Sequence, residues 1–408
     1  NAPFGMLVTI LESDNYLGRV LTGKIYSGKI KVGDPVKVLH LNGTVGEQGR
    51  LTKLLAFRGI ERTPIEEAEA GDIIVIAGLE NATVADTIGA PELETPIKAT
   101  PVDPPTMAIT LSVNDSPLAG REGSKVTSRM IRDRLMREAE GNVAIRLSES
   151  AGKDFFEVGG RGELQLGVLI ETMRREGFEL SVSRPRVLFK IEDGQKLEPV
   201  EEVQIDVDDA YTGIVVEKLS QRKGDMVEMR PSGGGKTRVK FHIPSRGMIG
   251  YQGEFLTDTR GTGILSRIFH NYAPYKGDIE GRHNGVLISN SGGEAVAYAL
   301  WNLEERGFLF IHPQTKVYEG MIIGQHSRDN DLEVNPIKGK QLTNIRTTSK
   351  DEAVRLTPPK DLTLEQAIAY INDDELLEVT PKSLRLRKKL LDPNERKRAS
   401  RAAEAAAG

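Results

Sequence analysis

The sequence has no cysteine, and aromatic residues make up only 5% of its 408 positions. Without cysteine there are no disulfides and no thiolate metal sites, and a reducing cytoplasm is permitted. Scarce aromatic rings give little support to stacking on nucleic-acid bases. No apolar run approaches the roughly 20 residues that a membrane-spanning helix needs. These absences are compatible with a cytoplasmic protein, which we expect to have no membrane partner.

A complete phosphate-binding loop is also absent. Such a loop has the pattern Gly-x-x-x-x-Gly-Lys-Ser/Thr, and residues 235–237 supply only its end, because the first glycine would fall on Arg230. We expect this segment between two antiparallel strands, where a nucleotide cradle does not form. Two interpretations remain open: a hairpin turn, or a flexible glycine-rich loop whose Lys236 and Arg238 contact RNA phosphate.

Metal and catalytic signatures are absent as well. The histidines are scattered without a His-x-x-x-His pair, and the acidic clusters at 206–209 and 329–333 lack the glycine of a calcium loop. No nucleophile lies at an informative spacing from a base. We therefore expect no catalytic residue, no metal ligand and no cofactor within this chain.

Positive charge is concentrated near the C-terminus, although the net charge of the chain is −4. Between residues 382 and 401, only Asp392 and Glu395 oppose a run of lysines and arginines. A nearly neutral protein with one basic end binds polyanions locally rather than over its whole surface. We expect this basic tail, residues 382–401, to contact RNA; the alternative is a disordered end that serves solubility.

Residues 1–103 predict a small β-barrel. Short runs rich in valine, isoleucine and leucine alternate with glycine-containing turns, which is typical of closed sheets. The segment 18–34, with its glycines in a fixed frame, resembles the second-domain barrel of translation factors. Prolines stiffen the following chain and mark a domain boundary: Pro91, Pro96, Pro101, Pro104 and Pro105.

The next two stretches, 104–190 and 191–280, each predict the order β-α-β-β-α-β of a ferredoxin-like domain. In the first, apolar residues at i, i+3, i+4 and i+7 from Leu166 form one helical face, and Gly177 ends that helix. The other helices are expected at 124–140, 212–222 and 248–259, and the strands at 107–113, 143–147, 155–158, 180–182, 200–207, 226–230, 238–243 and 263–272.

Two motifs in the first of these domains carry a family resemblance. Residues 161–166 read Arg-Gly-Glu-Leu-Gln-Leu, and residues 173–180 read Met-Arg-Arg-Glu-Gly-Phe-Glu-Leu. Both resemble the third domain of the elongation factor G group of translational GTPases. Elongation factor G inserts a whole domain between its two ferredoxin-like domains. Here only a short segment after Pro185 joins them, so that insertion is missing.

The C-terminal stretch, 281–408, predicts a further α+β domain. A capping box begins a helix at Thr363. A loop as long as 326–348 is usually either functional or disordered. The other expected elements are a strand at 286–289, a helix at 294–306, a strand at 317–325 and a strand pair at 376–386.

Several segments together resemble the BipA/TypA family of ribosome-associated translational GTPases: 230–237, 245–250, 335–346, 363–367 and 378–388. The likeness covers the chain from end to end, so the C-terminal domain is expected to be specific to that family. The sequence therefore predicts a multi-domain β and α+β protein with a translation-factor β-barrel, two ferredoxin-like domains and a family-specific C-terminal α+β domain.

The resemblance implies a larger protein whose N-terminal G domain holds GTP and Mg²⁺ and hydrolyses GTP. The first residues of the chain look like the cut edge of such a protein, so no GTPase activity is expected here. The family is implied to bind as a monomer between both ribosomal subunits, at the elongation factor G site. It is implied to assist assembly of the 50S subunit and translation under stress or at low temperature, with its C-terminal domain meeting ribosomal RNA and A-site tRNA.

We assign RNA contact to the long loop, the basic tail and the glycine-rich segment. Lysine and arginine would neutralise phosphate, and glutamine and asparagine would bond to sugar or base edges. Two rival functions remain: a protein–protein scaffold without RNA affinity, and a phosphate-binding enzyme built on residues 233–237. The candidate RNA-binding residues are Lys236, Arg238, Lys338, Lys340, Gln341, Asn344, Arg346, Lys382, Arg385, Arg387, Lys388, Lys389, Arg396, Lys397 and Arg398.

Overall fold

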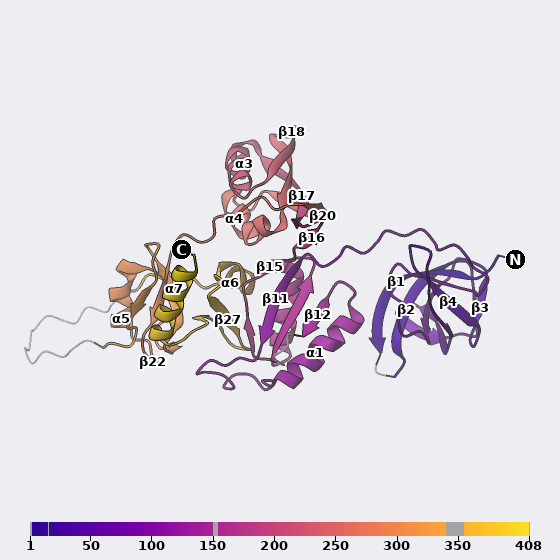
Figure 1. The fold of residues 1–408 in the computed structure, drawn as a ribbon, viewed down its shortest axis with the longest axis horizontal. Coiled ribbons are helices and arrows are strands. Elements are labelled where there is room, and N and C mark those ends of the chain that lie inside the picture. The colour runs from indigo at the N-terminus through magenta and orange to yellow at the C-terminus, as the bar shows by residue number, and fades with distance from the viewer. Residues whose placement is uncertain (1, 15, 150–153, 340–354, 408) are drawn as a thin grey trace, which may run out of the picture. The chain divides into compact units, whose positions relative to one another are not determined.

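The computed structural model describes the chain except for residues 1, 15, 150–153, 340–354 and 408. The chain divides into two compact units (Figure 1). The first unit is formed by residues 1–105, 132–148 and 159–161, and the second by 106–131, 149–158 and 162–408. None of the described helices is both long enough and apolar enough to cross a membrane.

The first unit is built on an antiparallel eight-stranded sheet in the order β5-β4-β10-β1-β2-β9-β6-β7, beside a small β3–β8 pair. Alternating side chains such as Met6, Leu21, Ile25 and Ile76 fill its core. The expected all-β character is confirmed, but the path stays open between β5 and β7, with no closing ladder among the described residues. The strands are β1 (Gly5–Asp14), β2 (Gly18–Ser27), β3 (Lys29–Lys31), β4 (Pro35–Leu39), β5 (Val45–Arg50), β6 (Lys53–Arg58), β7 (Glu61–Pro64), β8 (Glu67–Glu69), β9 (Ile73–Ala77) and β10 (Thr87–Gly89).

The predicted β-α-β-β-α-β order of the next stretch is confirmed. Its first helix begins later than expected, because the Thr127 Oγ1 accepts a hydrogen bond from the Met130 N–H and caps the helix there. Lys125 instead forms a β-bridge with Phe178. The elements are β11 (Met107–Ser112), α1 (Ser128–Gly141), β12 (Arg146–Glu149), β13 (Phe155–Gly160), α2 (Glu163–Arg175), β14 (Leu180–Val182) and β15 (Arg186–Val187).

The second β-α-β-β-α-β unit is also confirmed, with β20 and β19 on either side of the long strand β17. Val203 and Ile205 of β17 pack with Phe241 and with helix residues Tyr251 and Phe255 to form its core. Since side chains alternate along a strand, the polar residues between them lie on the opposite, open face of the sheet. The elements are β16 (Lys190–Glu192), β17 (Gln195–Asp208), η1 (Asp209–Tyr211), α3 (Thr212–Gln221), β18 (Asp225–Gly233), β19 (Lys236–Pro244), η2 (Ser245–Met248), α4 (Tyr251–Asp258) and β20 (Ile264–Pro274).

In the C-terminal stretch, the predicted capping box at Thr363 is confirmed. The expected helix at 294–306 is shorter, and the expected strand at 317–325 is interrupted at Gly320 (φ 86°). A strand begins within the expected loop 326–348, and the basic tail ends in a helix. The elements are β21 (Val286–Ser289), β22 (Gly293–Glu294), α5 (Ala297–Leu303), η3 (Glu304–Arg306), β23 (Gly307–Leu309), β24 (Lys316–Val317), β25 (Met321–His326), β26 (Leu332–Val334), α6 (Leu364–Tyr370), β27 (Glu375–Val379), β28 (Leu384–Lys388) and α7 (Pro393–Ala407).

The predicted strand pair β27–β28 does not stand alone, because β27 pairs with β14. The ladder places Ser181 opposite Glu378 and Val182 opposite Leu377. The second unit therefore holds one continuous sheet along the path β13-β11-β14-β27-β28-β25-β21-β26. Strands far apart in sequence thus share one sheet, which the local patterns did not predict. The four domain boundaries expected from the sequence stay predictions.

Gly307 offers a test of the contact between β23 and β25. A Cβ atom at Gly307 would lie 1.8 Å from the carbonyl oxygen of Gln325. Gly307→Ala should lower the free energy of unfolding by about 3 kcal/mol or more, because the paired backbones must separate. At Gly213 in α3, nothing lies within 4 Å of an added Cβ. Gly213→Ala should be neutral or stabilising by up to about 1 kcal/mol. Urea unfolding compares the two, and equal stabilities would contradict this description.

Candidate nucleic-acid interface

The predicted RNA-binding residues fall into buried, exposed and undescribed groups. Lys338 is exposed just before the undescribed segment. Lys340, Gln341, Asn344 and Arg346 lie outside the described residues, so their assignment stays a prediction.

The three cations of β28 are buried, which corrects their expected role. Arg385 is 8% exposed, and Arg387 and Lys388 are each 2% exposed. Each is ion-paired with at least one carboxylate of the second unit. A cation that is buried and neutralised in this way is not available to RNA phosphate. These three residues hold the fold together instead.

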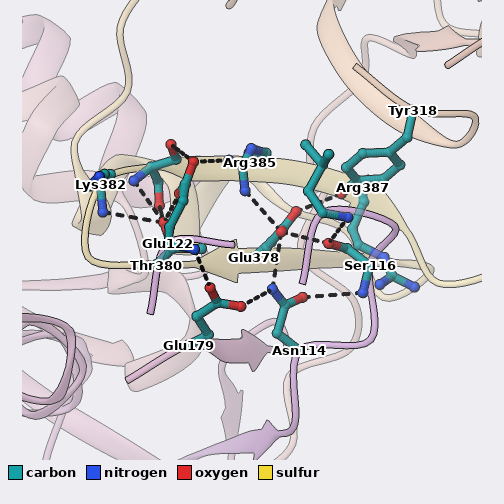
Figure 2. Close-up of polar contacts among 12 residues, drawn as sticks. Asn114, Ser116, Glu122, Glu179, Tyr318, Glu378, Thr380, Lys382, Arg385 and Arg387 are labelled. Carbon is teal, nitrogen blue, oxygen red and sulfur yellow. Dashed lines mark hydrogen bonds and ion pairs between the residues drawn. The ribbon is translucent and has the colours of Figure 1, made fainter. Parts of the chain in front are cut away.

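Arg385 belongs to a cluster centred on the fully buried Glu378 (Figure 2). One carboxylate oxygen of Glu378 accepts hydrogen bonds from Arg385 Nη1 at 2.9 Å, Ser116 Oγ at 2.6 Å and Asn114 Nδ2 at 3.0 Å. The other accepts one from the Tyr318 hydroxyl at 2.7 Å. Burial and then the Glu378 charge raise the pKa of Tyr318 well above its usual value. Four donors from separate parts of the chain therefore satisfy the buried carboxylate of Glu378.

Glu179 is a second buried carboxylate beside this cluster, and it is held almost entirely by N–H groups (Figure 2). It accepts hydrogen bonds from the backbone of Gly120 and Gly123, each at 2.7 Å, and of Glu122 at 3.1 Å. Asn114 Nδ2 donates a further one at 3.1 Å. Burial by itself raises the pKa of Glu179, but these donors outweigh it and the pKa is lowered.

Lys388 sits in a third charged cluster, on the other face of β28. Its Nζ lies 2.7 Å from Asp331, 2.7 Å from Asp374 and 3.0 Å from Glu375. Burial alone would lower the pKa of Lys388, but the three carboxylates outweigh it and raise the pKa. Arg282 also holds Glu375, through two hydrogen bonds of 2.8 and 3.0 Å.

One pattern in the sequence could have predicted these charged clusters. On the two strands of the predicted hairpin, Glu378 faces Arg385 and Glu375 faces Lys388. Opposite charges directly across a strand pair stabilise it, so the spacing indicates internal pairing. No comparable sequence signal marks Asn114, Ser116 or Glu179.

The remaining cations of the basic tail are mostly exposed. Arg396 is the exception, because its guanidinium lies 3.0 Å from Glu333 and is mostly covered. Lys382 and Lys389 are exposed, and Lys389 Nζ donates to the carbonyl of Asp373. Helix α7 adds further exposed cations: Lys397, Arg398 and Arg401.

The glycine-rich segment forms a hairpin turn between the antiparallel strands β18 and β19. Gly233, Gly234 and Gly235 have φ angles of 83°, 63° and 75°, which favour glycine. Lys236 Nζ lies 3.7 Å from Asp208, and Arg238 donates two hydrogen bonds of 2.7 and 3.0 Å to Asp206. The hairpin interpretation is thereby confirmed, and both cations already have acidic partners.

The open face of the second ferredoxin-like sheet brings together residues that the sequence left scattered. His242 Nε2 lies 3.5 Å from a carboxylate oxygen of Glu202. The ring of His270 stacks on that of His242 with 4.0 Å between centroids. Of the residues that the structure describes, these form the one group with the composition and spacing to hold a metal ion.

Three known domain families match successive parts of the chain. Elongation factor Tu domain 2 matches residues 18–89, and the elongation factor G C-terminus matches 195–283. The TypA/BipA C-terminal domain matches 284–393, which contains Glu378 and Lys388 but not Asn114 and Ser116, which donate to Glu378. Together with the fold, these matches define a multi-domain protein of the translation-factor class.

Curated relatives extend the likeness over nearly the whole chain. The chain is 46% identical to a protein of Bacillus subtilis strain 168 over 400 residues, covering 98% of this chain and 65% of that protein. It is 47% identical to one of Synechocystis over 388 residues, covering 95% and 65%. It is 49% identical to one of Haemophilus influenzae over 402 residues, covering 98% and 65%. Each relative is named large ribosomal subunit assembly factor BipA.

The chain belongs to the TypA/BipA family, as the sequence motifs predicted. It spans about 65% of the length of the curated relatives it matches. A solved structure from Thermus thermophilus aligns with a TM-score of 0.44 and 16% identity, over 68% of this chain and 56% of its own.

Replacing Glu179 tests the buried donors around it. Glu179→Gln should lower the free energy of unfolding at pH 7 by about 2 kcal/mol. The side-chain NH₂ group of glutamine cannot accept hydrogen bonds from the backbone N–H groups that surround this position. The folded pKa of Glu179 is lowered from 4.5, so its stabilisation is complete above that value and is lost as pH falls through the folded pKa. The penalty should therefore shrink below pH 4.5. Urea unfolding at several pH values measures it. Glu92→Gln, at an exposed position, should show neither effect.

The hairpin at Gly233–Lys236 also yields a prediction about nucleotides. Because its cations are paired and no helix N-terminus follows it, this chain should neither bind nor hydrolyse GTP. Calorimetric titration with GTP and Mg²⁺ should give no binding heat. Measurable turnover by the pure chain would overturn the hairpin assignment and revive the phosphate-binding enzyme.

Proposed function

We propose that this chain is the ribosome- and RNA-contacting part of a translational GTPase that assists assembly of the large ribosomal subunit. The family membership and the names of the relatives support the ribosome as partner. The exposed cations of the C-terminal helix α7 support RNA as the component that is touched.

The observation that carries the proposal is the arrangement of Lys397, Arg398 and Arg401 on α7. Residues three and four apart on a helix are neighbours, so both Lys397 and Arg398 lie next to Arg401. All three side chains are exposed, and none forms an ion pair with a residue that the structure describes. A compact group of free cations attracts phosphate and releases counterions when it binds.

The buried cations sharpen this proposal. Arg385 and Lys388 are paired with buried carboxylates and Arg387 with Asp115, so the positive charge that RNA would meet comes from other residues. Exposed lysines at 338, 382 and 389 join α7 in the proposed interface. Lys340, Gln341, Asn344 and Arg346 stay in it on the strength of the sequence alone.

The whole-protein activity is part of the same proposal. In the family pattern, GTP and Mg²⁺ are held by a G domain for which this sequence carries no motif. We place the intact protein at the elongation factor G site between both subunits, with ribosomal RNA and the A-site tRNA acceptor end near the C-terminal stretch. Assembly of the 50S subunit and translation under stress or at low temperature are the roles that this placement would serve. The rival is a protein scaffold, whose binding would be insensitive to salt.

Removing the α7 cations tests the proposal. The triple variant Lys397→Ala, Arg398→Ala and Arg401→Ala should bind ribosomes more weakly than the unchanged chain. Its plot of log affinity against log salt should also be shallower by about 2 to 3, because three phosphate contacts are lost. Co-sedimentation with ribosomes over a salt series measures both quantities.

A matched control removes as many exposed cations elsewhere. Lys24, Lys53 and Lys98 are exposed lysines of the first unit, and their joint replacement by alanine should leave the salt slope unchanged. Equal losses in both triple variants would point to net charge alone and contradict a local interface. Salt-insensitive binding by the unchanged chain would favour the protein scaffold.

A further inference from the structure

We propose that Glu202, His242 and His270 form a binding site for a divalent transition-metal ion of the Zn²⁺ class. The site lies on the open face of the sheet in the second ferredoxin-like unit, with one ligand from each of three adjacent strands. It does not depend on RNA binding by α7.

Strand register brings the three side chains together. Glu202 of the central strand β17 lies directly opposite His242 of β19. On the other side, β20 carries a bulge: Val200 pairs with Asn271 and Glu201 with Phe269, so His270 is the extra residue between them. A bulge re-aims the side chain of its extra residue. Here it turns the His270 ring onto the His242 ring, above the middle strand.

The geometry is close to that of a metal site without an ion. The candidate ligand atoms all lie within 4.8 Å of one another, and the His242–Glu202 pair is at 3.5 Å. Bonds of about 2.0–2.1 Å in a tetrahedral site place ligand atoms about 3.3 Å apart. One pair is thus nearly at that separation. The His270 side chain is exposed, so its ring is free to rotate toward the other two ligands.

The lysine and arginine side chains along this face are paired with other acids, so Glu202 is available to the two histidines. Arg238 is paired with Asp206, and Lys240 lies 3.8 Å from Glu228. Glu202 has no lysine or arginine ion pair among the residues that the structure describes; its ion pair is with His242. Two imidazoles and one carboxylate are the donors that Zn²⁺, Co²⁺, Ni²⁺ and Cu²⁺ accept, whereas Mg²⁺ and Ca²⁺ prefer oxygen alone.

Three protein ligands leave one tetrahedral position for water or for a group from a partner. A bound ion would also clamp β19 and β20 to β17. Since binding to the folded state stabilises it by mass action, Zn²⁺ should raise the unfolding temperature of the chain.

Titration calorimetry with ZnCl₂ tests the site in the tag-free, chelator-treated chain. We expect one ion per chain at pH 7.5, with weaker binding as the pH is lowered because imidazole must be neutral to bind metal. His242→Ala and His270→Ala should each weaken binding by at least about tenfold. Glu202→Gln keeps the shape of the site and removes one metal ligand, so it should also weaken binding. This variant tests the site even if the alanine variants fold poorly. Co²⁺ absorption in the visible range should report tetrahedral nitrogen and oxygen ligands.

His283→Ala is the matched control, because His283 lies 3.4 Å from Glu280 in an exposed pair that belongs to no three-ligand group among the described residues. This variant should bind Zn²⁺ like the unchanged chain. Equal affinity of the unchanged chain and a His242→Ala, His270→Ala double variant would overturn the site. The double variant should keep the salt-dependent ribosome binding of the unchanged chain, so failure of the metal site and failure of RNA binding are separate results.

Discussion

The buried carboxylate of Glu378 is the constraint on which the second unit depends. A charge removed from water must be compensated by donors, or the fold loses several kcal/mol. Glu378 has its donors in Asn114, Ser116, Tyr318 and Arg385, up to 264 residues away in sequence. The hydrogen bonds to this one carboxylate therefore hold the loop after β11, the segment before β25 and the β27–β28 hairpin together (Figure 2).

This constraint divides the basic C-terminal end into two parts with different uses. Arg385 and Lys388 of β28 are ion-paired inside the sheet, where they face Glu378 and Glu375 across the hairpin. Lys397, Arg398 and Arg401 of α7 have no such acids opposite them among the described residues and remain in solvent, whereas Arg396 is paired with Glu333. A uniformly basic stretch of sequence thus becomes a structural hairpin followed by a charged helix. The exposed cations of the helix, together with Lys382 and Lys389, retain the accessible charge that binding to phosphate requires.

On the open sheet face of the second ferredoxin-like unit, the fold again brings together side chains that are distant in sequence. His242 and His270 are 28 positions apart and share no sequence motif. A long central strand with a partner on each side, together with one bulge, places them face to face above Glu202. Sheets join distant residues in this way because hydrogen-bonded neighbours need not be neighbours in the chain.

The sequence by itself determined the order of elements in both β-α-β-β-α-β units, the family and the local signals. Apolar periodicity predicted both β-α-β-β-α-β units, and Thr363 with Gln366 predicted the capping box, because these features depend on residues only a few positions apart. The tertiary structure alone decided the pairing of β14 with β27, the bridge between Lys125 and Phe178 and the burial of Arg385, Arg387 and Lys388. The physical reason is that a charged side chain is exposed or buried according to its partners, and here those partners come from distant parts of the chain.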